Sequence, residues 1–127
     1  MSSISTSTTI NAVPSGGSPL PVQPRPVIRR DDADRLLLNI IEARTTTCAS
    51  DFESCMDHAY FIVNSMYQAN RDSNPTEIFS EMIGLINDAR DAMFGTNTVD
   101  YVNQRAVLCI LHLNEKYLEL VNQTTQI

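Results

Sequence analysis

Residues 99–122 read VDYVNQRAVLCILHLNEKYLELVN, and this stretch decides the fold. Its apolar residues recur every three or four positions, which is the spacing of an α-helix, and Thr98 before it is a typical N-cap residue. The predicted helix carries two adjacent apolar stripes, Val102, Ala106, Ile110, Leu113, Tyr117 and Leu120 in one and Val107, Leu111, Leu118 and Val121 in the other. Such a helix is either central in a bundle or paired with something outside it.

Two further helices are predicted near the middle of the chain. The first begins near Asp31 or Asp32, because acidic residues suit the positive end of a helix dipole, and it weakens at the threonines of 45–47. Its apolar positions are Leu36, Leu37, Ile40 and Ile41. The second follows Ser50, which has the spacing of a capping box with Glu53, and it ends near residue 70. Its apolar stripe is Phe52, Met56, Ala59, Tyr60, Val63, Met66 and Tyr67.

The segment 74–95 predicts one more helix. Asn74 is placed as its N-cap, Pro75 as its first residue and Gly95 as its C-terminal cap. Its apolar stripe is Ile78, Met82, Leu85, Ile86, Ala89 and Met93. Gly84 in its middle weakens the helix, so we expect a close helix crossing there. No segment shows the pattern of a strand. The sequence thus predicts an all-α fold, a compact bundle of about four helices in residues 30–127.

Residues 1–29 are predicted to be a disordered arm or linker. Ser, Thr, Pro and Gly dominate this segment, and it has too few apolar residues to repay the entropy of ordering. The first 30 residues contain Arg25, Arg29 and Arg30 and no acidic residue, whereas the rest of the chain has six basic and fifteen acidic side chains. These three arginines are therefore candidate partner-binding residues, directed at an acidic surface.

Composition limits the classes of partner. The net charge of −6 argues against general nucleic-acid binding, which needs a concentrated positive surface, so nucleic acid is an expected partner only through the arm. The sequence contains no apolar run long enough to span a membrane and no signal-peptide pattern. Three cysteines and no secretion signal favour reduced thiols and an intracellular location, cytoplasmic or nuclear.

The two histidines each follow a cysteine by three positions. Cys55 and His58 fall in the second predicted helix, and Cys109 and His112 in the fourth. Residues three apart share one face of a helix. If the two helices pack at that level, the four side chains form a Cys2His2 set of the kind that binds zinc. The alternative is that both cysteines are small buried hydrophobic residues and both histidines lie at the wet edge.

No complete set of catalytic residues is found, so we expect that the protein is not an enzyme and needs no cofactor. Phe61 lies opposite the main stripe of its helix and is a further candidate contact for a partner. The preferred hypothesis is a non-enzymatic protein–protein interaction or assembly subunit of a homo- or hetero-oligomer, and one form of it is a small structural protein associated with a viral capsid or nucleocapsid. The alternative hypothesis is a small zinc-stabilised helical regulatory domain using Cys55, His58, Cys109 and His112.

Overall fold

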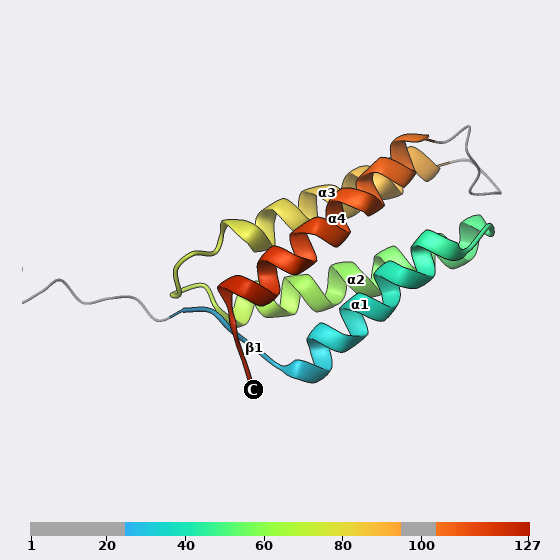
Figure 1. Cartoon of the computed structure of the whole chain (residues 1–127). Helices are drawn as coiled ribbons and strands as arrows, with labels where there is room; N and C mark the ends of the chain where they lie inside the picture. The colour runs from blue at the N-terminus through green and yellow to red at the C-terminus, as the bar shows by residue number, and fades with distance from the viewer. Residues whose placement is uncertain (1–24, 95–103) are drawn as a thin grey trace, which may run out of the picture.

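The computed structural model describes residues 25–94 and 104–127, and it confirms the all-α bundle (Figure 1). The described helices are α1 (Arg30–Thr45), α2 (Ala49–Ala69), α3 (Glu77–Met93) and α4 (Gln104–Gln123). Two short strands, β1 (Val27–Ile28) and β2 (Thr125–Gln126), flank them in sequence. Most of the predicted arm, together with Gly95, Thr98 and Val102, lies outside the described residues.

The helices form a closed ring. α1 packs against α2, α2 against α3, α3 against α4, and α4 against α1. Consecutive helices run in opposite directions, as the colour gradient along each helix in Figure 1 shows. α2 and α4 therefore occupy opposite corners of the ring. No helix in the described ranges is long and apolar enough to cross a membrane.

The core is built from one stripe of each helix, as the periodicity predicts. The fully buried side chains of greatest volume are Phe52, Phe79, Leu36, Ile40, Met56, Ile78, Met82, Ile86, Ile110, Leu113, Leu120 and Val63. On α4 the first predicted stripe is buried throughout its described length, from Ala106 to Leu120. Burial of these stripes, at about 1.5–3 kcal/mol for each large side chain, is the main source of stability.

Two helix starts differ from the prediction. α2 begins at Ala49, with Cys48 as its N-cap and no side-chain capping bond. Ser50 lies inside the first turn, where its hydroxyl contacts the Cys48 sulfur at 3.0 Å, so the predicted capping box does not form. α3 begins at Glu77 after Thr76, two residues later than predicted. The Phe79 amide donates to the Thr76 carbonyl, and burial of the Phe79 ring fixes the level at which this first turn meets the core.

Strands β1 and β2 form a parallel pair that the sequence did not reveal. Val27 pairs with Thr125 and Ile28 with Gln126, and the Arg30 amide donates to the Ile127 carbonyl at 2.9 Å. The sequence assigns residues 25–29 to the linker, but the structure places them against the bundle, where Ile28 is buried. Strands of two residues are too short to produce a detectable alternation.

Candidate functional site

The four residues of the predicted zinc site are not brought together. Cys55 and His58 lie on α2 and Cys109 and His112 on α4, at opposite corners of the ring. Over residues 25–94 and 104–127, no three Cys, His, Asp or Glu side chains form a group that could hold a metal ion. The predicted convergence required α2 and α4 to be neighbours, but each helix packs on the next one in sequence and α4 packs on α1.

The two histidines face different grooves. His58 is exposed between α1 and α2, beside Arg35 and Asn39. His112 is exposed between α3 and α4, beside Asp88 and Gly84. Because the two histidines line different grooves, they are not neighbours in the fold.

The three thiols have contrasting environments. Cys55 is buried and donates to a Glu42 carboxylate oxygen at 3.5 Å, and burial, reinforced by Glu42, raises its pKa to about 11. Burial also raises the pKa of Cys109. The pKa of exposed Cys48 is lowered by hydrogen bonds from the Ser50 hydroxyl and from the backbone amides at the start of α2. Only Cys48 combines exposure with a stabilised thiolate, and a reactive thiol needs both.

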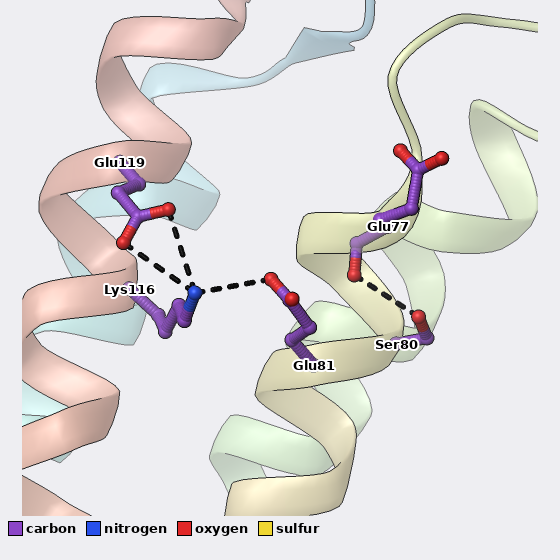
Figure 2. A network of polar contacts seen from close by, with 5 residues as sticks. All are labelled: Glu77, Ser80, Glu81, Lys116 and Glu119. Atoms are coloured by element: carbon purple, nitrogen blue, oxygen red, sulfur yellow. Dashed lines mark hydrogen bonds and ion pairs between the residues drawn. The ribbon is translucent and has the colours of Figure 1, made fainter.

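Half of the residues that line the groove between α3 and α4 are acidic. The Lys116 ammonium donates to Glu81 on α3 at 3.1 Å and lies 3.5 Å from Glu119 on its own helix, so it joins the two helices (Figure 2). On α3, the Ser80 hydroxyl donates to the Glu77 carbonyl in the first turn. Gly84 opens onto this groove, and apart from its chain neighbours and the backbone of its own helix no atom lies within 4 Å of a Cβ placed there. The expected close helix crossing at Gly84 is therefore wrong, because the glycine faces solvent.

Phe61 lies on the outer side of α2, as predicted, with 73% of its surface exposed. It lines a shallow hollow of about 280 Å³ together with Leu38 of α1 and with His58. The hollow is lined by both apolar and polar residues, and it is a secondary candidate contact surface.

The predicted cationic cluster is divided. The Arg25 guanidinium donates to the carbonyls of Asn122 (2.7 Å) and Gln123 (3.4 Å) and so caps the end of α4. Arg29 is exposed just before α1, next to Asp31. Arg30 is exposed as the first residue of α1. Because acidic residues of α1 interleave with these arginines, the local charge is mixed.

The second predicted stripe of α4 lies on the outside of the bundle. Leu111 is 42% exposed and Leu118 is 57% exposed, while Val107 and Val121 are half-buried. Neighbouring α1 adds Leu37, half-buried, and Ile41, 43% exposed. We call this surface the α1/α4 face; it comprises Leu37, Ile41, Val107, Leu111, Asn114, Leu118 and Val121.

The α1 part of this face was missed by sequence reasoning. Leu36, Leu37, Ile40 and Ile41 read as one apolar cluster, but only Leu36 and Ile40 are in the core. The available signal was the width of the cluster, because five of the six residues from 36 to 41 are apolar, and they cover more of a helix than one packed seam needs.

Comparisons of the chain with protein-family models, with curated proteins and with solved structures found no match.

Proposed function

We propose that the protein is a non-enzymatic interaction and assembly subunit that binds another protein chain through the α1/α4 face. The observation that carries the proposal is the exposure of the second apolar stripe of α4. The large aliphatic side chains of Leu111 and Leu118 are exposed to water, although the first stripe of the same helix is already buried in the core. Contiguous exposed apolar surface of this kind is typical of protein interaction sites.

The surroundings of the face support an interface. Its centre is aliphatic, and the charged residues Asp34, Arg44 and Glu115 are exposed along its edges. An apolar centre with a polar rim is the usual anatomy of a protein–protein interface. The hollow at Phe61 is lined by three apolar residues, whereas the α1/α4 face has six, so the hollow ranks second.

Site-specific photocrosslinking tests the proposal. The full chain, carrying a photoreactive amino acid in place of Leu118, is expressed in its native cells and irradiated. A matched variant carries the same group in place of Glu53, which is exposed on α2 away from the face. We expect position 118 to form a crosslink to a protein chain and position 53 to form none.

The identity of the captured chain decides the kind of complex, a capsid or nucleocapsid among them. Equal crosslinking from positions 118 and 53, or none from either, would contradict the proposal.

A further inference from the structure

We propose that the α1/α4 face binds a second copy of the same chain, with the two α4 helices antiparallel about a two-fold axis near Asn114. This inference rests on the proposed function and deepens it by naming the partner. A two-fold interface brings the same patch of both copies together, so the patch must be complementary to itself. Two features of the face meet that condition.

The first feature is the order of side chains along α4. Val107, Leu111, Asn114, Leu118 and Val121 follow one another at intervals of four, three, four and three residues. This is the heptad spacing of a helix seam. The order Val-Leu-Asn-Leu-Val is the same in both directions, so an antiparallel partner centred on Asn114 places Val107 opposite Val121 and Leu111 within one residue, about 1.5 Å, of the height of Leu118. Asn114, half-buried at the centre, meets Asn114 of the other copy, where one polar residue in a seam sets the register.

The second feature is the charge pattern of α1. Asp34, Leu37, Ile41 and Arg44 have intervals of three, four and three residues and so share the side of α1 next to α4. Asp34 and Arg44 are both exposed, and within the described ranges neither forms an ion pair. Reversing the direction of this face places Asp34 of one copy opposite Arg44 of the other. In the same way, Leu37 of one copy lies opposite Ile41 of the other.

The two patterns lie at corresponding heights along the bundle. α1 and α4 are antiparallel neighbours, and the Arg30 amide bonds to Ile127 at one end. Asp34 is close enough to Tyr117 to add to the effect of burial in raising the pKa of that phenol. Because Asp34 is near Tyr117 and the two helices are antiparallel, the midpoint of the α1 pattern, residue 39, falls within about one helical turn of Asn114. A single two-fold axis therefore serves both helices.

Charge pairing selects the antiparallel arrangement over the parallel one. A two-fold axis that makes the α4 helices parallel runs along them and carries the two α1 helices to opposite sides of the α4 pair, so Asp34 and Arg44 would have no partner across the interface. The antiparallel arrangement instead places α1 on α1 and forms two complementary contacts between Asp34 and Arg44.

The size of the face sets the expected affinity. The stripe from Val107 to Val121 is about 21 Å long at about 1.5 Å per residue, and two adjacent helices make it about 20 Å wide. This is smaller than a standard interface, which buries about 800 Å² on each partner. We therefore expect a dimer that forms at micromolar concentrations and dissociates on dilution.

Sedimentation of the full chain over a micromolar to millimolar range tests self-association. We expect a monomer–dimer equilibrium that Leu118→Asp weakens by about 100-fold or more, because two carboxylates would be buried without partners. Leu108→Asp is the matched control, since Leu108 is on the same helix and is 54% exposed against 57% for Leu118, but it lies outside the stripe. Its dimerisation should change by less than about 3-fold.

A charge exchange tests the predicted pairing of Asp34 with Arg44. Asp34→Arg alone or Arg44→Asp alone should weaken the dimer about 10-fold, because each change turns two attractive contacts into repulsive ones. The double variant should recover to within about 3-fold of the wild-type dissociation constant. Failure of the double variant to recover would overturn the proposed geometry.

Cysteine crosslinking reports the direction of the helices. In a Cys48→Ser background, Asn114→Cys should form a disulfide-linked dimer under mild oxidation. Val107→Cys should link only when mixed with Val121→Cys, because the antiparallel pair brings those two positions together. Linking of Val107→Cys with itself would show a parallel pair and overturn the inference.

The inference and the proposed function can fail separately. A chain that stays monomeric at millimolar concentration, yet is captured through position 118 by a different protein, overturns the inference and keeps the proposed function. A monomer in which position 118 reacts only within its own chain contradicts both, and would assign the face to another segment of the same chain.

Discussion

The side chain of Asn70 forms two hydrogen bonds with the backbone of Val27, and it mimics a neighbouring strand. Its Oδ1 accepts from the Val27 amide at 2.8 Å, and its Nδ2 donates to the Val27 carbonyl at 2.9 Å. The same Nδ2 donates to the Met66 carbonyl at 2.8 Å, so Asn70 also closes the end of α2. Asn70 is 5% exposed and is one of two buried polar residues in the described part of the chain. Asn70 therefore links β1, where the chain enters the bundle, to the core.

Replacing Asn70 should destabilise the protein. We expect Asn70→Ala to lower the free energy of unfolding by about 2 kcal/mol, because the part-buried backbone groups of Val27 and the buried carbonyl of Met66 lose their partners. Asn70→Asp keeps the shape and one acceptor but loses both donated bonds, so it should cost at least as much. Urea unfolding measures both changes. Asn87→Ala, on the exposed face of α3, is the control and should cause no loss; wild-type stability of Asn70→Asp would contradict the assigned role.

Substituting Gly84 by alanine should stabilise the protein. Gly84 is exposed in the middle of α3, and an added Cβ would meet nothing within 4 Å apart from its chain neighbours and the backbone of its own helix. Alanine restricts the unfolded chain and favours the helix, so the free energy of unfolding should rise by about 1 kcal/mol. Thermal and urea unfolding check this, with Gly84→Ser expected to give a smaller gain. A loss of stability would show that something packs on this position.

The spacing of apolar residues along the sequence predicted the helices and most of the core. The features that it did not predict depend on contacts between segments far apart in the sequence. The first stripe of α4 repeats at helical spacing, so Ile110, Leu113 and Leu120 could be placed in the core directly. The hydrogen bond between Asn70 and Val27 joins residues 43 positions apart in the sequence. From the sequence alone, an asparagine at a helix end indicates a helix cap and gives no sign of such a distant partner. The zinc prediction failed for the same reason, since only the order of helices around the ring decides whether Cys55 and Cys109 meet. The exposure of Ile41 likewise depends on where α4 packs on α1.

The three cysteines should react with alkylating reagents at very different rates. Cys48 is exposed and hydrogen bonds lower its pKa, whereas Cys55 and Cys109 are buried and have raised pKa values. At mildly alkaline pH we expect iodoacetamide to modify Cys48 first, and the other two only as the bundle opens. Ser50→Ala should shift the rate–pH profile of Cys48 to higher pH, because the Ser50 hydroxyl contributes most to lowering its pKa. Peptide mass spectrometry over time measures all three rates, and early modification of Cys55 would contradict its burial.

Stability should fall between pH 9 and pH 11. Burial raises the pKa of Cys55 from 9.0 to about 11 in the folded protein, and the pKa values of Cys109 and Tyr117 are raised in the same direction. The unfolded chain therefore loses these protons first, so the stabilisation is complete below pH 9 and is lost as the pH rises through the folded-state values. For Cys55 the loss amounts to about 2 kcal/mol. Urea unfolding at several pH values measures the slope, and Cys55→Ala should flatten it. If the slope is equally steep in Cys55→Ala, the Cys55 thiol is not the group whose ionisation opposes the fold.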